Sequence, residues 1–257
     1  KFMKKAKDFF SKLHPNIPIT ITNHQTAEMI KYANNSFLAT KISFINQLSN
    51  ICQNIPGANI DDIAKTIGLD PRIGALFLNA GPGYGGSCLP KDMKALISFA
   101  DKIGINPTLL NAVEKINQKQ IQNIVSLMEK TLGTLTSKRI TVLGTAFKPN
   151  TDDVRDSIAI ELIKKLLKKK SRITIYDPKA MKNTRNVFGE KIIYAGSIAD
   201  ALNKSQCAIL MTHWKQFERF NNNSIKHMSK KFIIDCRRIL VEKELQAEYH
   251  AIGIGKI

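Results

Sequence analysis

KRITVLGTAFKPNTDDVRDSIAIELIKKLLKKKSRITIYDP, residues 138–178, is the stretch that decides the fold of this chain. It opens with an apolar segment, residues 139–144, that is typical of a buried strand. A helical apolar pattern follows from Ile158 to Leu167, and a second strand pattern runs from Arg172 to Pro178. A strand, a helix and another strand in this order predict a parallel βαβ unit.

The same alternation continues to the end of the chain, with strand patterns at residues 192–194, 208–212 and 232–235 and helices between them. We therefore expect an α/β domain over residues 134–257, with a Rossmann-like, doubly wound parallel sheet. Ligands of such sheets bind beyond the carboxyl ends of the strands. The loop at residues 144–157 is the first of these ends, so it is a candidate ligand loop.

The preceding part, residues 25–133, has helical rather than strand patterns. A long helix is predicted over residues 25–55, and a short one follows around Asp61 to Ile67. Another long helix is predicted over residues 106–132, with apolar spacing at Leu109, Val113, Ile116, Ile124 and Leu127. We expect an all-helical central region with a long connecting helix. Residues 1–24 are basic and then extended, and form a third segment.

Within the helical region lies a second informative stretch, GPGYGGSCLPKD, residues 81–92. Its four glycines allow tight turns and a close approach to a ligand. Pro90 suits the first turn of a helix, which puts Cys88 at or just before a helix N-terminus. The helix dipole and Lys91 favour a thiolate there, so Cys88 is a candidate nucleophile. The alternative is a glycine-rich loop with a small buried cysteine.

Composition limits the class of protein. The 257 residues include 39 Lys and Arg against 21 Asp and Glu, a net charge of +18. Either a solvated lysine-rich surface or nucleic-acid binding would account for this charge, but no aromatic residues interleave the lysines as a stacking platform requires. A basic cleft would also attract an anionic substrate. We expect no nucleic-acid partner.

Cysteine and histidine spacing excludes other classes. The four cysteines lie far apart, and the five histidines show no spacing of metal ligands. We expect no metal site, no disulfide framework and a reducing, cytoplasmic setting. No run of eighteen apolar residues is present, so no membrane span is expected.

Several motifs together resemble one family. GPGYGGSCLPKD resembles the active-site segment of the UDP-glucose/GDP-mannose dehydrogenase family. Segments at residues 27–35, 70–74, 144–157 and 235–238 resemble the family's other motifs in the same order. The resemblance implies NAD-dependent oxidation of UDP-glucose to UDP-glucuronate, with two hydride transfers and with a thiohemiacetal and a thioester on Cys88. GDP-mannose or another nucleotide sugar is the alternative substrate.

The resemblance also assigns residues. The residues implied to be catalytic are Cys88, Lys31, Asn35 and Asp92. Those implied to bind the substrate are Arg72, Phe77, Leu78, Asn79, Tyr84, Gly85, Phe147, Lys148 and Arg238. Those implied to bind the cofactor are Lys91 and Arg155. Four of these residues have structural alternatives. Lys31 and Asn35 would lie on a solvated helix face, Asp92 would serve the helix dipole, and Arg155 would pair with Asp152 or Asp153.

By the same resemblance, residues 1–24 correspond to the end of an NAD-binding domain, and the chain corresponds to the later two-thirds of the enzyme. No GxGxxG follows a predicted strand. We therefore expect NAD to bind a separate domain and this chain alone to be inactive. The resemblance further implies a homodimer through the 106–132 helix, with Arg72 reaching the partner's site. A non-catalytic fragment that binds UDP-sugars and dimerises is the alternative of a different class.

Overall fold

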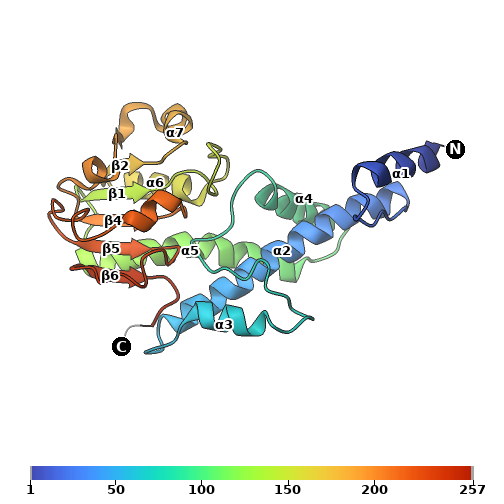
Figure 1. Ribbon diagram of the computed structural model, residues 1–257, viewed down its shortest axis with the longest axis horizontal. Helices are drawn as coiled ribbons and strands as arrows, with labels where there is room; N and C mark the ends of the chain where they lie inside the picture. The colour runs from blue at the N-terminus through green and yellow to red at the C-terminus, as the bar shows by residue number, and fades with distance from the viewer. Residues whose placement is uncertain (1, 256–257) are drawn as a thin grey trace. The chain divides into compact units, whose positions relative to one another are not determined.

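The computed structural model of the chain describes residues 2–255 (Figure 1). They fall into two compact units, the first ending at Asn34 and the second beginning at Asn35. Helix α2 (His24–Cys52) begins in the first unit and continues in the second. The first unit also contains α1 (Phe2–Leu13), an amphipathic helix that the sequence analysis did not foresee. Its phenylalanines Phe2, Phe9 and Phe10 are exposed.

The second unit contains a six-stranded sheet in the order β3-β2-β1-β4-β5-β6, with every neighbouring pair parallel. This is the order of a doubly wound fold, and it confirms the predicted α/β class. The strands are β1 (Arg139–Leu143), β2 (Arg172–Tyr176), β3 (Ile193–Tyr194), β4 (Cys207–Leu210), β5 (Phe232–Asp235) and β6 (Glu248–Ala251). Only β6 was not predicted, because its residues include Glu, Tyr and His and give no apolar run.

Alternating side chains of the central strands form two buried clusters, one on each face of the sheet. One face is covered by α5 (Thr108–Leu132) and α6 (Ile158–Lys168), through side chains such as Ile124, Met128 and Leu162. The other is covered by α8 (Ile198–Leu202) and the 3₁₀ turn η2 (Lys215–Arg219), with Trp214 and Phe220 beside them. Helix α7 (Met181–Phe188) and the short turn η1 (Gly189–Lys191) join β2 to β3.

The helical region of this unit is made of the later part of α2, α3 (Ile60–Ile67), α4 (Leu89–Lys102) and the first turns of α5. Two small buried clusters hold it together. Ile45, Ile60 and Leu78 belong to one, and Ala39, Met93 and Val113 belong to the other. Thus α2 supplies a buried side chain to each cluster and connects α3 with α4.

The chain after β6 returns to this helical region. The Ile60 amide donates to the Gly253 carbonyl at 3.0 Å, and the Gly255 amide donates to the Ala58 carbonyl at 2.9 Å. An isolated bridge joins Asn59 to Ile254. The end of the sheet region and the start of α3 are therefore directly bonded, which fixes the helical region against the sheet within this unit.

Helix α5 uses its apolar face inside the chain. Val113, Ile124 and Met128 are at most 3% exposed, while Leu109 at the start of the helix is 64% exposed. The homodimer that the sequence analysis expected through the 106–132 helix stays a prediction; within the chain, this face of the helix packs against α6 and the sheet. Large apolar side chains that lie exposed in this unit include Phe37, Phe44 and Ile51 on α2, and Leu69 and Leu76 after α3.

Candidate active site

The glycine loop at residues 81–86 is held from two sides by buried asparagines. The Asn46 side chain of α2 accepts a bond from the Gly81 amide at 2.8 Å. The Asn117 side chain of α5 accepts from the Tyr84 amide at 2.8 Å and donates to the Tyr84 carbonyl at 3.0 Å. Because a primary amide has both a donor and an acceptor, Asn117 satisfies both backbone groups of Tyr84. The loop is therefore fixed although it is rich in glycine.

Cys88 is the N-cap residue of α4, with Pro90 in the first turn, as the sequence predicted. Its thiol is exposed, whereas Cys52, Cys207 and Cys236 are buried. Burial raises the pKa of the Cys207 and Cys236 thiols. Among the described residues, Cys88 is thus the one exposed thiol, and it lies at the positive end of a helix, where a thiolate is stabilised.

Asn35 of α2 and Asp92 of α4 form a polar pair, and Asp92 lies one helical turn after Cys88. Asp92 is fully buried, and it accepts a bond of 2.6 Å from the Asn35 amide. The exposed Lys91 ammonium lies 3.1 Å from the other oxygen of Asp92. The structure thus brings together Asn35 and Asp92 from the predicted catalytic set, and it pairs Lys91 with this carboxylate. Lys31 lies in the first unit, with its ammonium 5.1 Å from the centre of the Tyr32 ring, and its catalytic role stays a prediction.

The loop after β1 packs directly on the glycine loop. The Gly86 amide donates to the Asp156 carbonyl at 3.3 Å. Gly86 has φ +85°, and a Cβ built there would lie 2.6 Å from the Phe147 ring. A Cβ on Gly85 would collide with the Asp156 carbonyl. Glycine is therefore required at both positions because another backbone and an aromatic ring occupy the space of a side chain.

Between these loops is a cleft with a volume of about 530 Å³. It lies beyond the carboxyl ends of β1 and β4, the point at which the strand order of a doubly wound sheet reverses. Four basic side chains line it: Lys148, His213, Arg237 and Arg238. Asp61 is the single carboxylate in its lining. The cleft suits an anionic ligand with an apolar or aromatic part.

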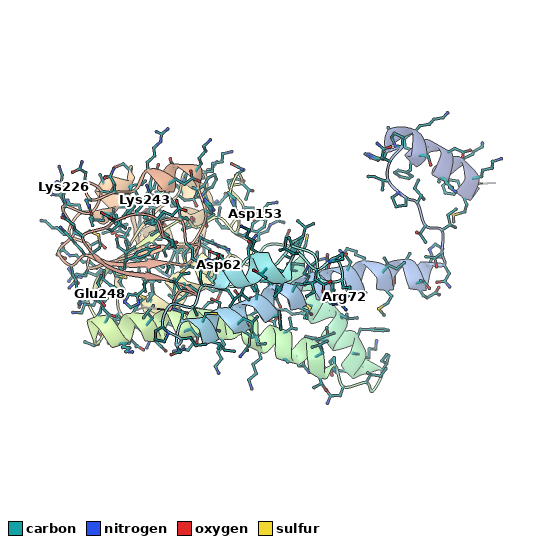
Figure 2. All side chains as sticks on the ribbon, turned by 60° about the horizontal axis from the view of Figure 1, so that its bottom comes forward. Asp62, Arg72, Asp153, Lys226, Lys243 and Glu248 are labelled. Atoms are coloured by element: carbon teal, nitrogen blue, oxygen red, sulfur yellow. The ribbon has the colours of Figure 1, made fainter. Side chains whose placement is uncertain are left out.

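Most of the predicted substrate residues line this cleft, namely Phe77, Asn79, Tyr84, Gly85, Phe147, Lys148 and Arg238. Two do not. The Leu78 side chain is 3% exposed and packs in the cluster with Ile45 and Ile60, so the structure places it in the core instead. The Arg72 side chain is 88% exposed and is held by two bonds to Asp70 (Figure 2). In this position Arg72 faces solvent rather than the cleft of its own chain.

Tyr84 reaches the cleft but directs its hydroxyl elsewhere. The hydroxyl donates to Glu114 of α5 at 3.0 Å, and the side chain is 4% exposed. Burial, followed by the Glu114 charge, raises the Tyr84 pKa well above its ordinary value. Tyr84 is therefore a neutral wall of the cleft and not an acid or base at neutral pH.

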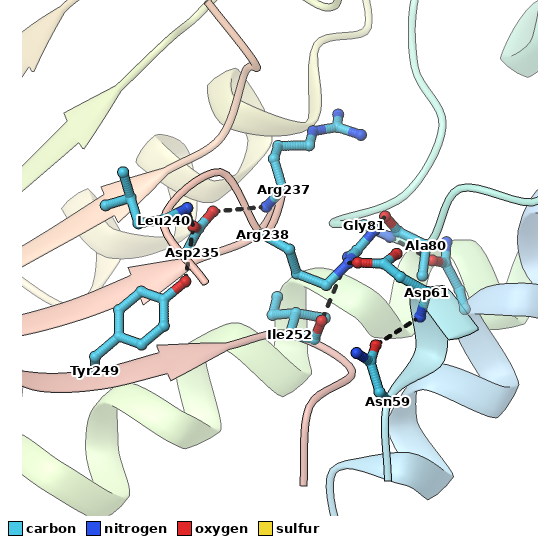
Figure 3. Close-up of polar contacts among 11 residues, drawn as sticks. Asn59, Asp61, Ala80, Gly81, Asp235, Arg237, Arg238, Leu240, Tyr249 and Ile252 are labelled. Atoms are coloured by element: carbon cyan, nitrogen blue, oxygen red, sulfur yellow. Dashed lines mark hydrogen bonds and ion pairs between the residues drawn. The ribbon is translucent and has the colours of Figure 1, made fainter. Parts of the chain in front are cut away.

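The two arginines after β5 have different surroundings (Figure 3). Arg238 was predicted to bind substrate, and its guanidinium bonds Asp61 at 2.7 Å, the Ala80 carbonyl at 2.9 Å and the Ile252 carbonyl at 3.3 Å. It therefore ties the sheet to α3 and to the glycine loop. Arg237 makes one bond with its side chain, from Nε to the Met211 carbonyl at 2.8 Å. Desolvation lowers the Arg237 pKa.

The sequence analysis missed Arg237, Thr212 and His213 as cleft residues. Thr212 and His213 follow β4, at the strand end next to β1. A histidine or arginine directly after a buried strand in a predicted doubly wound sheet is the signal that could have identified them.

Arg155 has the salt bridge that the sequence analysis gave as the alternative. Its guanidinium makes two bonds to Asp153, of 2.7 and 3.0 Å, and Figure 2 labels this carboxylate. The bond to Asp153 raises the Arg155 pKa, and the nearby Cys88 sulfur adds a smaller effect in the same direction. Arg155 is 72% exposed. A contact with a cofactor stays a prediction.

Two other properties bear on the site. Within residues 2–255, no three His, Cys, Asp or Glu side chains gather in a way that could hold a metal ion. None of the helices described in that range has the length and apolar character needed to cross a bilayer.

Comparison with known proteins identifies the family of this chain. Residues 25–119 match the profile described as the UDP-glucose/GDP-mannose dehydrogenase family, central domain, and residues 141–242 match the UDP binding domain of the same family. The chain belongs to the UDP-glucose/GDP-mannose dehydrogenase family. The region between the two matches, residues 120–140, extends from the middle of α5 to the start of β1, so this chain contains both parts.

Similar proteins agree with this family. UDP-glucose 6-dehydrogenase TuaD from Bacillus subtilis is 40% identical over 97% of this chain and 55% of its own length. A UDP-glucose dehydrogenase structure from Pyrobaculum islandicum superimposes with a TM-score of 0.86 at 32% identity, over 98% of this chain and 57% of that one. For a UDP-D-ManNAc dehydrogenase from Pyrococcus horikoshii the TM-score is 0.81 at 26% identity, over 98% and 58%. The chain spans little more than half the length of these relatives.

Proposed function

We propose that this chain carries the catalytic cysteine and the nucleotide-sugar site of an NAD-dependent UDP-glucose 6-dehydrogenase. The observation that carries the proposal is the position of Cys88. It is an exposed thiol at a helix start, and Gly85 and Leu89, close to it in the sequence, line a basic cleft. The names of the relatives support UDP-glucose as the sugar nucleotide. A diphosphate would lie against Lys148 and Arg237, since guanidinium and ammonium groups bind phosphate oxygens.

In the proposed reaction, the Cys88 thiolate adds to the aldehyde stage of the sugar. A carbon–sulfur bond forms, and the carbonyl electron pair moves to oxygen, which becomes protonated in the thiohemiacetal. Loss of a hydride from that carbon, together with the hydroxyl proton, gives a thioester. Water then attacks the thioester carbon, the carbon–sulfur bond breaks, and the acid is released with the thiolate restored. We assign oxyanion stabilisation to Lys31 and orientation of the reacting oxygen or water to Asn35, whose amide is fixed by Asp92.

NAD supplies the hydride acceptor when it is bound, but the sheet of this chain does not fit it. The Thr145 and Ala146 amides, which begin the loop after β1, both donate to Asp177 and are not available to a pyrophosphate. Asp177 is 1% exposed, so it cannot serve as a ribose-binding acid. A Cβ on Gly144 would contact Thr212 at 2.6 Å, which shows that this turn is closed by protein. We therefore assign to this chain the sugar-binding and thiol steps only.

We further propose a homodimer and a separate NAD-binding domain as partners, in the cytoplasm. The exposed side chains of Phe37, Phe44 and Ile51 on α2 support a contact with a second copy. The exposed phenylalanines of α1 support a contact with a further domain. Exposed Arg72 supports a role at the partner's site.

Calorimetry with UDP-glucose, GDP-mannose and NAD, each titrated separately into the chain, tests the proposal. We expect binding of UDP-glucose, much weaker binding of GDP-mannose and no binding of NAD. Preference for GDP-mannose would change the proposed substrate but not the proposed location of the site. Absence of binding for both sugar nucleotides would contradict the proposal.

Turnover is tested separately, because the competing proposal is a binding fragment without chemistry. NAD and UDP-glucose mixed with the chain should give no NADH absorbance, since no dinucleotide site holds the nicotinamide near the sugar. Addition of an NAD-binding domain from a relative should restore some NADH production, and Cys88→Ser should abolish what is restored. Robust NADH production by the chain alone would show that the cofactor binds within these 257 residues.

A further inference from the structure

The dipeptide Thr145–Ala146 immediately precedes the cleft residues Phe147 and Lys148, and all four of its backbone groups are bonded by side chains. Both amides donate to Asp177, at 2.6 and 3.0 Å. The Thr145 carbonyl accepts from the Ser157 hydroxyl, and the Ala146 carbonyl accepts from the Thr212 hydroxyl, both at 2.7 Å. Because side chains bond all four of these backbone groups, the direction in which Phe147 and Lys148 leave the dipeptide is defined.

The Asp177 carboxylate accepts five bonds from three strand ends. Oδ2 accepts from the two amides after β1 and from the indole Nε1 of Trp214 after β4, at 3.2 Å. Oδ1 accepts from the Lys179 and Ala180 amides, which lead into α7, at 2.9 and 2.8 Å. Asp177 itself follows β2. One buried carboxylate therefore joins the loops that follow β1, β2 and β4.

Two of these three loops line the cleft. Phe147 and Lys148 come from the loop after β1, and Thr212 and His213 come from the loop after β4. Trp214, which bonds Asp177, directly follows His213 and is 5% exposed. Asp177 does not line the cleft, so it acts on a ligand only through the groups that it holds.

We propose that Asp177 is the positioning residue of the nucleotide-sugar cleft, because its carboxylate fastens the loops after β1 and β4 to each other and to the loop after β2. The inference rests on the proposed function for the identity of the ligand, a nucleoside diphosphate sugar. A carboxylate is required because all five partners are N–H donors and an ionised carboxylate only accepts. An amide of the same shape would place an N–H group against N–H groups on one of its two sides.

The test compares Asp177→Asn with Thr141→Val. Thr141 is equally buried and bonds the Ala201 carbonyl and Ser205, but it lies in β1 away from the carboxyl ends of the strands and does not line the cleft. Trp214 is the single tryptophan, so its emission reports on the Asp177 contact. We measure UDP-glucose affinity by calorimetry, tryptophan emission without ligand, and amide hydrogen exchange over residues 145–148 and 211–214.

For Asp177→Asn we expect UDP-glucose binding to weaken by about 10-fold or more, with shifted emission and faster exchange in both segments. For Thr141→Val we expect affinity within about 2-fold of the wild type, even where its thermal midpoint falls equally, since a buried bond is lost but no cleft loop moves. Wild-type affinity in Asp177→Asn, or equal losses in the two variants, would overturn the inference.

Two other experimental outcomes also bear on the inference. Should the wild type not bind UDP-glucose, the proposed function fails, and the exchange data alone judge the positioning role: faster exchange in Asp177→Asn but not in Thr141→Val supports it, and unchanged exchange refutes it. Should Asp177→Asn not fold, Trp214→Phe replaces it, because that change removes one donor and keeps an aromatic ring. We then expect about 3-fold weaker binding, and wild-type affinity would refute the link between the loops.

Discussion

Side chains of the same residue type have different roles in this chain. Arg238 is 6% exposed and makes three bonds within the chain, whereas Arg237 beside it makes one and faces the cleft. Cys88 is exposed and Cys236 is buried. A motif such as Cys236-Arg237-Arg238 therefore includes a core residue, a candidate ligand residue and a tie between elements. Burial and hydrogen bonding distinguish them.

Cys88 should react with iodoacetamide at least about 10-fold faster than the other three cysteines, because it is exposed and lies at a helix start. Burial raises the pKa of Cys207 and Cys236, which slows them further. Peptide mapping after a brief treatment measures the four rates, and Cys88→Ser is the control. Equal labelling of Cys52 and Cys88 would refute the assignment of Cys88 as the reactive thiol.

For the elements, the site depends on contact between two loops from different parts of the sequence. Asn46 and Asn117 fix the glycine loop by hydrogen bonds to its backbone. The Phe147 ring packs on Gly86 of the same loop. The loop after β1 is fixed at its base by Asp177. Each loop therefore supplies part of the other's support, and a change in either should alter the cleft between them.

Gly86→Ala should destabilise the chain by about 1–3 kcal/mol and weaken UDP-glucose binding, since the methyl group meets the Phe147 ring and φ is +85°. Gly104→Ala is the matched control, because Gly104 has φ +78° with nothing within 4 Å. It should lose only the conformational part of that free energy, about 1 kcal/mol, and bind normally. Thermal unfolding and calorimetry measure both. Identical behaviour of the two variants would show that the ring contact is unimportant.

The sequence predicted most of the helices and strands, but it was less informative about which residues lie next to each other in the fold. Apolar runs identified five of the six strands, and Gly, Pro and Cys88 located the start of α4. Strand β6 was not predicted because its residues are mostly polar, and α1 was missed because residues 1–24 were interpreted by their charge, although Phe2, Phe9 and Phe10 have helical spacing. Thr212, His213 and Arg237 escaped because their roles depend on which strands are adjacent, and linear patterns do not show strand order.

For the molecule as a whole, the sequence correctly indicated a helical region followed by a sheet. The apolar face of α5 is occupied by the chain's own core. On α2, Phe37, Phe44 and Ile51 recur every seven residues and are 65%, 52% and 48% exposed. A seven-residue apolar repeat on a helix is the pattern of helix–helix association.

Phe44→Asp should therefore convert a dimer into a monomer, since a carboxylate would have to be buried in the contact. Sedimentation velocity of the wild type should show a dimer. Leu109→Asp, at the exposed start of α5, is the control and should leave the dimer intact. A monomeric wild type, or loss of the dimer only in Leu109→Asp, would contradict the assignment to α2.

The bonds between residues 57–60 and 253–255 have a consequence for how the chain is made. Ile60 and Gly253 are roughly 190 residues apart, so this contact closes a very long loop, and its entropic cost is met late in folding. Domains generally form in order of synthesis, but α3 does not acquire these partners until Gly253 has been translated. A released chain truncated before Gly253 should therefore remain sensitive to protease around α3 while the sheet is already protected.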